Sequence, residues 1–232
     1  MKLRYKVLIG LVLFVLLSGC FHSVSNDAET SESVSSSAVA AAVVEKVNYQ
    51  IADKEVDTLE RVTYRVKLDK RIITAQNLKD VAEDIVKTDA KGQRYTTMFF
   101  FFYGPSDYVM SSYMLGTLKY APYGEMGNHL KARSDYSNFE FFDGEAIIYS
   151  TENLPSEKEF EICGAVDRGY AELNWDYDKE SEMGYSEYSD YREETVKSTV
   201  ASKYGITTEE VHETYMDVLT ARYDLAKKQT FN

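Results

Sequence analysis

The sequence predicts an α+β protein, in which an antiparallel sheet with one packed helix is followed by a helical extension that ends in an αα-hairpin. Two observations support this prediction. Over residues 44–152, apolar residues mostly alternate with polar ones, as in half-exposed strands, and one helical stripe interrupts the alternation. Over residues 153–232, apolar residues instead recur every three or four positions. We therefore expect a sheet domain over 44–152 and a helical extension over 153–232 that packs on it.

The first two strands and the first helix are predicted by clear periodic patterns. The segments 47–51 and 61–68 (RVTYRVKL) alternate apolar with polar residues, so each strand should bury one face. A helix over 75–87 should follow, because Thr74 can cap its N-terminus and its apolar residues share one stripe. The residues of this stripe are Leu78, Val81, Ala82 and Ile85.

The segment 98–103 (MFFFFY) carries the strongest core signal. It is apolar on both faces, which suits a covered central strand, and an exposed run of this kind would be prone to aggregate. We therefore expect it in the middle of the sheet, with Phe101 buried. A strand over 113–121 and a hairpin over 139–149 should complete the sheet, since Asp143-Gly144 suits a type I′ turn.

Three of these segments together resemble a known family. They are the run Thr63–Ile72 (TYRVKLDKRI), the helix that carries Leu78 and Ala82, and the run Tyr95–Tyr103 (YTTMFFFFY). In these segments the chain resembles a small domain of unknown function that occurs in secreted and lipid-anchored bacterial proteins. The resemblance covers residues 44–121 and implies a strand, a helix and two further strands in that order. The family brings no catalytic residues.

Capping patterns predict three helices in the extension. A Ser-x-x-Glu box at 156–159 precedes an apolar stripe over 160–173, and a Thr-x-x-Glu box at 207–210 precedes another. Between them a helix should open near Asp190 and end at Gly205, so that the last two helices form an antiparallel hairpin. Such a pair has the outline of a helix-turn-helix, but no basic face is present to meet phosphates. We therefore expect no nucleic-acid binding.

The first twenty residues indicate export and lipidation. Residues 1–6 carry three positive charges, and residues 7–17 form an apolar run. The run is too short to cross a bilayer, which takes about 20 residues. Leu17-Ser18-Gly19-Cys20 resembles the lipobox of bacterial lipoproteins, which implies cleavage of a signal peptide over 1–19 and a lipid, including palmitate, on the Cys20 thiol. We expect the protein to be anchored outside the cytoplasm, at the outer face of the cell membrane or in the outer membrane.

The mature chain should be a folded domain on a flexible tether. Residues 20–43 are rich in Ser, Ala and acidic residues and hold too little apolar surface to order themselves. Loss of residues 1–19 changes the formal net charge from −12 to about −15. This acidity opposes binding to nucleic acids and to anionic lipid surfaces. The lipid on Cys20 is therefore the expected membrane contact.

No residue pattern indicates an enzyme. The three histidines, His22, His129 and His212, lack metal-ligand spacing, and neither a phosphate loop nor a nucleophile elbow is present. Cys163 lies on the apolar stripe of its helix, which favours a buried structural thiol. The 38 acidic residues leave one alternative open, which is a surface hydrolase that uses a pair of carboxylates.

The acidic segment 176–187 has an incomplete EF-hand outline. Five carboxylates occupy positions 1, 3, 5, 7 and 12 of a twelve-residue calcium loop, and they are Asp176, Asp178, Glu180, Glu182 and Glu187. Ser181 stands at position 6, where the sharp turn requires Gly. A solvated acidic loop is therefore favoured over a weak calcium site, and no other cofactor is expected.

These patterns favour a non-enzymatic binding, inhibitor or envelope-accessory protein whose partner is an envelope protein, a peptide or a glycan. Its nineteen tyrosines, many of them beside acidic residues, favour a contact surface because tyrosine offers contact area at low entropy cost. A flat tyrosine-rich face would support binding. A deep pocket holding two carboxylates with raised pKa values would support the hydrolase.

Overall fold

The computed structural model describes residues 46–112, 114–124, 131–139 and 142–231. The chain divides into two units, Met1–Ala42 and Val43–Asn232, and every described residue belongs to the second. The predicted signal peptide and tether, including Cys20, lie outside the described residues. No helix in the described part of the chain combines the length and the apolar character needed to span a bilayer.

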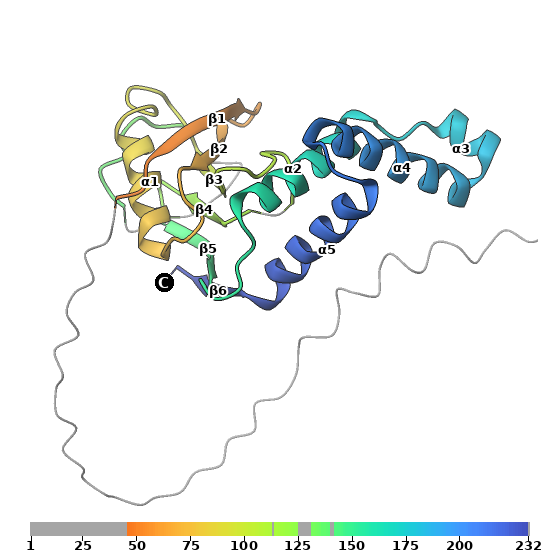
Figure 1. Ribbon diagram of the computed structural model, residues 1–232. Coiled ribbons are helices and arrows are strands. Elements are labelled where there is room, and N and C mark those ends of the chain that lie inside the picture. The colour runs from red at the N-terminus through yellow and green to blue at the C-terminus, as the bar shows by residue number, and fades with distance from the viewer. Residues whose placement is uncertain (1–45, 113, 125–130, 140–141, 232) are drawn as a thin grey trace, which may run out of the picture. The chain divides into compact units, whose positions relative to one another are not determined.

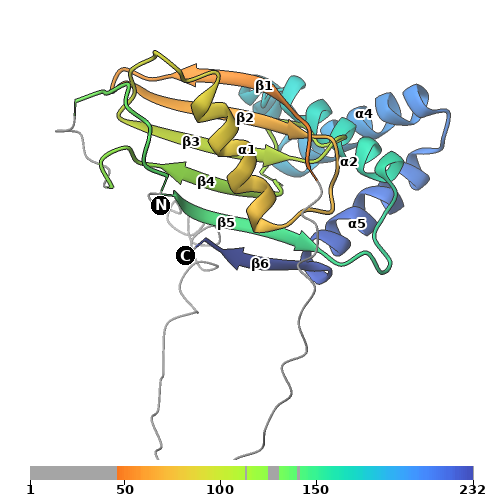
Figure 2. The ribbon, with the colours of Figure 1, turned by 90° about the vertical axis from the view of Figure 1, so that its left-hand side faces the viewer.

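The second unit is α+β, as predicted, and consists of a six-stranded sheet, a helix on one sheet face and a helical extension (Figure 1). Figure 2 shows helix α1 (Ala75–Lys87) lying across one face of the sheet, with the extension on the far side near one end of the strands. The strands follow one another across the sheet in sequence order. They are β1 (Tyr49–Val56), β2 (Arg61–Leu68), β3 (Thr97–Tyr103), β4 (Gly116–Tyr120), β5 (Phe142–Tyr149) and β6 (Ala226–Thr230).

The sheet is mixed, and the prediction of an antiparallel sheet was wrong at one pair of strands. β2 and β3 are parallel neighbours, whereas the other four neighbouring pairs are antiparallel. Helix α1 joins β2 to β3. Such a crossover brings the chain back to the end of the sheet at which β2 begins, so β3 runs in the same direction as β2. The alternation of apolar residues reports which face of a strand is buried and contains no signal for its direction.

Helix α1 begins and ends where the sequence predicts. The Thr74 hydroxyl accepts a hydrogen bond from the Asn77 N–H, and the Asn77 side chain accepts one from the Thr74 N–H. This reciprocal capping box satisfies N–H groups that a helix start leaves unpaired. The buried stripe of α1 packs on the inward side chains of the central strands, where the Phe100 ring stacks 5.3 Å from Tyr64 and 6.2 Å from Phe102, centroid to centroid.

Strand β3 lies in the middle of the sheet, as predicted, but its two faces differ. Phe100 and Phe102 point toward α1 and are fully buried. Phe101 is half-buried on the other face, so the prediction of a buried Phe101 was wrong. The cross-strand neighbours of Phe101 are Arg65 and Thr117, so polar residues flank it on both sides.

Residues 142–149 form the single strand β5 instead of the predicted hairpin. Gly144 lies inside β5, opposite Leu118 of β4. A Cβ atom at Gly144 would overlap the Thr117 carbonyl oxygen. Gly144 therefore allows β4 and β5 to approach closely, and close backbone approach is a common reason for a glycine inside a strand.

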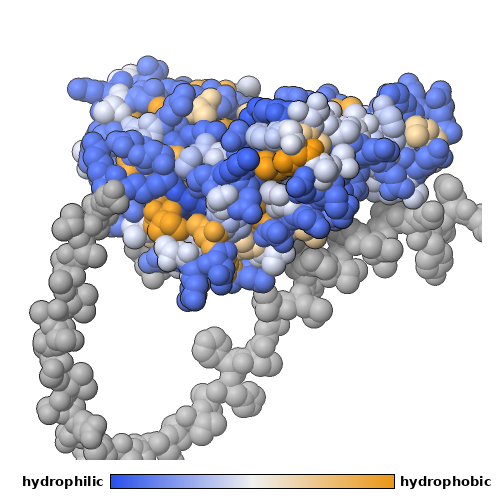
Figure 3. All heavy atoms as spheres, in the orientation of Figure 1, coloured by the Kyte–Doolittle hydropathy of each residue, from blue (hydrophilic) through white to orange (hydrophobic). Residues whose placement is uncertain are grey.

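The extension consists of α2 (Glu157–Glu172), α3 (Tyr177–Met183), α4 (Tyr185–Tyr204) and α5 (Thr208–Asp224). The capping boxes of α2 and α5 are present as predicted, and Gly205 ends α4 with a positive φ of 67°. Two differences stand out. The sequence did not predict α3, and after α5 the chain returns to the sheet as β6, so the αα-hairpin does not end the extension. Figure 3 shows hydrophilic residues over most of the far end of the extension and an apolar patch near α2.

The two faces of β3 give a prediction of stability. Phe100→Ala should lower the free energy of unfolding by about 3 to 5 kcal/mol, because it removes a fully buried ring and leaves a cavity. Phe101→Ala should cost less than half as much, since part of that ring is already in water. Urea unfolding of both variants measures the difference. Equal losses of unfolding free energy would show that the sheet face that carries Phe101 is as well covered as the face under α1.

Candidate functional site

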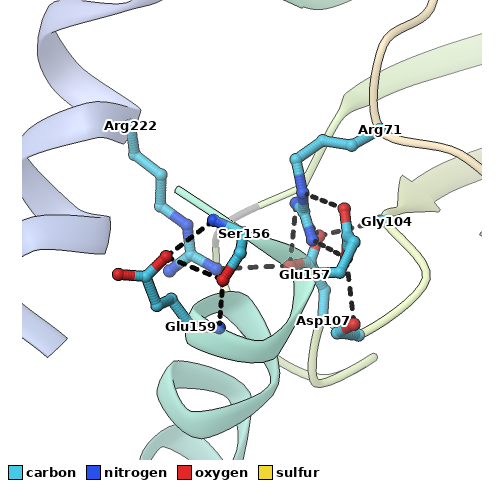
Figure 4. Close-up of polar contacts among 8 residues, drawn as sticks. Arg71, Gly104, Asp107, Ser156, Glu157, Glu159 and Arg222 are labelled. Atoms are coloured by element: carbon cyan, nitrogen blue, oxygen red, sulfur yellow. Dashed lines mark hydrogen bonds and ion pairs between the residues drawn. The ribbon is translucent and has the colours of Figure 1, made fainter. Parts of the chain in front are cut away.

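A buried ionic cluster joins the extension to the sheet (Figure 4). Its members are Arg71 before α1, Asp107 in the loop after β3, Glu157 at the start of α2 and Arg222 in the last turn of α5. Arg71, Asp107 and Arg222 are only 3%, 2% and 8% exposed. Burial of three charged side chains is costly unless they pair with one another.

Pairing within the ionic cluster is extensive. Arg71 Nη1 donates to both oxygens of Asp107 at 3.0 and 3.1 Å, while its Nε and Nη2 donate to Glu157 at 2.9 and 3.1 Å. Arg222 Nη2 lies 3.3 Å from Asp107 Oδ1, and the Gly104 N–H donates to Asp107 Oδ2 at 2.7 Å. The Arg71 guanidinium also stacks 3.4 Å from the centroid of the Phe160 ring. Such paired contacts hold the planar guanidinium in a single orientation.

Two glycines allow the chain to close around the ionic cluster. A Cβ atom at Gly104 would lie 2.7 Å from the Arg71 guanidinium. A Cβ atom at Gly164 of α2 would lie 2.7 Å from the Ser106 carbonyl oxygen. The cluster is therefore a packed junction between the extension and the sheet, with no room for a ligand beside these backbones.

Two reactive groups adjoin this junction. Arg222 Nη1 lies 3.4 Å from the Cys163 sulfur and 4.0 Å from Asp167 Oδ2. Cys163 is buried, as predicted, and burial raises the pKa of its thiol to about 12, so the thiol is protonated at neutral pH and is a poor nucleophile. Burial also raises the pKa of Asp167, although Arg222 opposes that change.

The grooves of the molecule are lined by other residues. One groove of about 430 Å³ lies between α2 and α4, one of about 280 Å³ between β1 and α1, and one of about 310 Å³ between α4 and α5. In the last of these, Nζ of Lys197 lies 2.7 Å from Nδ1 of His212 and pairs with Glu193. The buried carboxylates Asp107 and Asp167 line none of these three grooves. Other carboxylates do share a groove: Asp80 and Asp84 line the one between β1 and α1, and four acidic residues line the one between α4 and α5. Asp167, the carboxylate whose pKa is raised by burial, is not among them.

The segment with the EF-hand outline folds as a helix rather than a loop. Residues Tyr177–Met183 form α3, and Asp176 caps it by accepting hydrogen bonds from the N–H groups of Asp178 and Lys179. Glu180 accepts a hydrogen bond from Trp175, so it does not face the other carboxylates as a ligand would. In the described ranges, no group of three His, Cys, Asp or Glu side chains could hold a metal ion. The predicted loop was wrong because the acidic run is also a good capped helix.

The far end of the extension presents an aromatic platform, which we define as Trp175, Tyr185, Tyr188 and Tyr191. The Trp175 ring lies 5.6 Å from Tyr185 and 5.1 Å from Tyr188, and Tyr188 lies 6.2 Å from Tyr191, all between centroids. Tyr188 is buried beneath the others, and its hydroxyl accepts a hydrogen bond from the Asp176 N–H at 2.9 Å. These contacts fix the rings in position before any partner arrives.

The platform is exposed and surrounded by negative charge. Tyr185 is 67% exposed, and the neighbouring Tyr177 is 75% exposed. Residues 175–191 hold six acidic residues and one basic residue, Lys179. The five carboxylates of the incomplete EF-hand outline therefore belong to the surroundings of an aromatic surface.

Comparison with known proteins adds little. No family model matches the chain, and no curated protein matches it. Among solved structures, the chain is similar to a DUF487 family protein from Desulfovibrio piger, with a TM-score of 0.36 and 12% identity over 79% of this chain and 94% of that one. A similarity of this strength carries no argument, and the resemblance over residues 44–121 stays a prediction.

Sequence analysis did not identify the ionic cluster. Arg71 and Asp107 are 36 residues apart, and Asp107 and Arg222 are 115 apart, so no local pattern connects them. One signal was present in the sequence. Arg222 continues the apolar stripe of α5 in line with Val211 and Val218, and a cation on such a stripe indicates a buried ion pair.

Two substitutions should separate the roles of the buried carboxylates. Asp107→Asn should lower the free energy of unfolding by about 3 to 5 kcal/mol, because two buried arginines lose their shared partner. Asp167→Asn should act in the opposite direction at neutral pH. Because burial raises the pKa of Asp167, its ionised form is disfavoured in the folded state. The stability it contributes is therefore present below the unfolded-state pKa of about 3.9 and is lost as pH rises through the folded-state pKa.

The measurement is urea unfolding of both variants and the parent at acidic and neutral pH. The stability of Asp167→Asn relative to the parent should increase from acidic to neutral pH. If Asp167→Asn is instead as destabilising as Asp107→Asn at neutral pH, Asp167 is an essential ion-pair partner of Arg222.

Proposed function

We propose that this chain is a non-enzymatic, lipid-anchored bacterial protein that binds an envelope partner outside the cytoplasm through the aromatic platform. The observation that carries the proposal is the exposure of Tyr185 while its ring packs on Trp175, a support that is already fixed. Large aromatic side chains dominate the energetics of protein interfaces. Most exposed tyrosines lose side-chain entropy when they bind, and a ring that is already packed against Trp175 loses less.

Charge around the platform narrows the class of partner. Six acidic residues surround it, and two basic side chains lie against its rings. Lys179 is 5.2 Å from the Tyr191 ring and Arg192 is 4.8 Å from the Trp175 ring, measured to the centroids. Charge complementarity between interfaces speeds encounter and selects partners, so a basic protein or peptide surface fits this site best. Arginine and lysine side chains can also stack on exposed tyrosine rings.

Anchoring rests on the residues before the described unit. The lipobox at residues 17–20 supports lipidation of Cys20, and two or three acyl chains are enough for stable attachment. The acidic, Ser-rich segment 20–43 would keep the folded unit clear of the lipid headgroups. The platform would then be displayed to partners within reach of the membrane.

Cys20→Ser tests the anchor. The variant should incorporate no palmitate and should keep residues 1–19, because the lipobox that implies both lipidation and cleavage needs this cysteine. Its melting temperature should equal that of the parent, since the substitution lies outside the folded unit. Incorporation of labelled palmitate by the variant to the level of the parent would contradict lipid anchoring at Cys20.

Site-specific photo-crosslinking in cells tests the platform. A benzoylphenylalanine side chain at position 185 should give a crosslinked envelope protein. At position 223 of α5 it should not, because Tyr223 is also exposed, at 74% against 67% for Tyr185, but lies outside the platform. Tyr177→Ala should reduce the crosslink from position 185. Equal yields from positions 185 and 223 would mean that the platform is not the binding surface.

A further inference from the structure

The groove between α2 and α4 has a floor suited to an apolar group. Ala165 and Gly169 of α2 and Val196 and Val200 of α4 line it, and its volume is about 430 Å³. A Cβ atom at Gly169 would lie 2.8 Å from Val196 Cγ1, so the two helices approach closely and leave a shallow trough above their contact. A trough between two helices is a common binding place for side chains of a third.

Two cations stand on the rims of this groove without carboxylate partners. Arg168 lies 5.7 Å from the Tyr108 ring, and Lys203 lies 4.9 Å from the Tyr204 ring, measured to the centroids. Within the described residues, no carboxylate oxygen lies within 4 Å of either cation. Glu172 is the acidic residue that lines the groove, one helical turn beyond Arg168. The lining of the groove therefore carries one net positive charge in a chain of net charge −12, and Glu161 accepts a hydrogen bond from the hydroxyl of the same Tyr204.

The groove and the aromatic platform lie on the same face of α4. Tyr185, Tyr188, Arg192, Thr199 and Lys203 are spaced by three, four, seven and four residues, and such steps return to one side of a helix. The centre of the platform at Tyr188 and the centre of the groove at Thr199 are eleven residues apart, which is about 16 Å along the axis. One surface therefore has an aromatic end rich in carboxylates and an apolar end with one net positive charge. Arg192 lies on the same face of α4, 4.8 Å from the centroid of the Trp175 ring.

We propose that two copies of this chain pair antiparallel through this face, with the platform of each copy lying over the groove of the other. A two-fold axis between the platform and the groove would bring the two opposite ends into contact twice. Tyr185 would then enter the apolar trough, and the acidic residues around it would face Arg168 and Lys203. The macrodipoles of the two α4 helices would also run in opposite directions, which is favourable.

This inference rests on the proposed function, because it assigns a second copy of the chain to the same aromatic platform. Pairing covers Tyr185, so a basic envelope partner would compete with the second copy for the platform. Anchoring on one membrane raises the effective concentration of the copies, and a weak contact is then sufficient. Self-association and partner binding are consequently measured in separate experiments.

Sedimentation velocity of residues 21–232, which include the whole compact unit, tests the pairing from micromolar to millimolar protein. We expect a concentration-dependent dimer that weakens as salt rises, because opposite charges face each other. Lys203→Glu and Tyr185→Ala should each weaken it by at least about tenfold, which is 1.4 kcal/mol. Lys91→Glu and Tyr223→Ala are matched controls on exposed residues away from this face, and they should leave the dimer unchanged.

Three outcomes would overturn the inference. They are a monomer at every concentration, a dimer that Lys203→Glu and Tyr185→Ala do not weaken, and a dimer that the two control variants weaken equally. A monomer combined with a crosslink from position 185 to another envelope protein would reject the pairing and leave the proposed function standing. A crosslink from position 185 to a second copy alone would reject the separate partner and support the pairing.

Discussion

The ion pair between Arg71 and Asp107 is the interaction on which the arrangement of this molecule depends. Asp107 belongs to the loop after the central strand, and Arg71 holds both that carboxylate and Glu157, the first residue of α2. Arg222 brings the end of α5 to the same carboxylate just before the chain returns to the sheet as β6. The extension is therefore fixed to the sheet at its first and its last helix by the two members of one ion pair, with Arg71 holding α2 and Asp107 holding α5.

Buried ion pairs are weak evidence for stability, because the cost of removing charges from water offsets much of their attraction. The ionic cluster instead fixes one position of the extension on the sheet. Two apolar surfaces can shift against each other with little loss of buried area. The Arg71 guanidinium, held by two carboxylates and stacked on Phe160, has one favourable geometry. Gly164 reinforces it, since α2 can contact the Ser106 backbone only where no side chain intervenes. The sheet thus acts as a fixed base from which the extension projects.

The elements that sequence analysis predicted correctly have local signals, and those that it missed depend on distant residues. Helices α1, α2 and α5 each start at a capping box and carry an apolar stripe, so about four neighbouring residues decide where they begin. The parallel direction of β3 depends on the crossover through α1, and no local pattern reports it. Gly144 lies in a strand rather than a turn because β4 pairs closely with it. Asp-Gly is a good turn, but the strand pairing of its neighbours outweighs that preference. Sequence analysis noted only that many tyrosines lie beside acidic residues. It missed the aromatic platform because the edge-to-face contact of Trp175 with Tyr188 depends on the fold around α3, a helix that the acidic pattern concealed.

The far end of the extension explains why one short segment carries so many tyrosines. This end lies beyond the reach of the sheet, so it cannot gain stability from the main core (Figure 1). Tyr188 and Trp175 supply a small aromatic core in its place, with their polar atoms bonded to Asp176 and Glu180. An aromatic core this small cannot enclose all of its rings, so Tyr185 and Tyr177 remain in solvent. The same packing that stabilises a projecting helix end therefore leaves an ordered aromatic surface for another protein to cover.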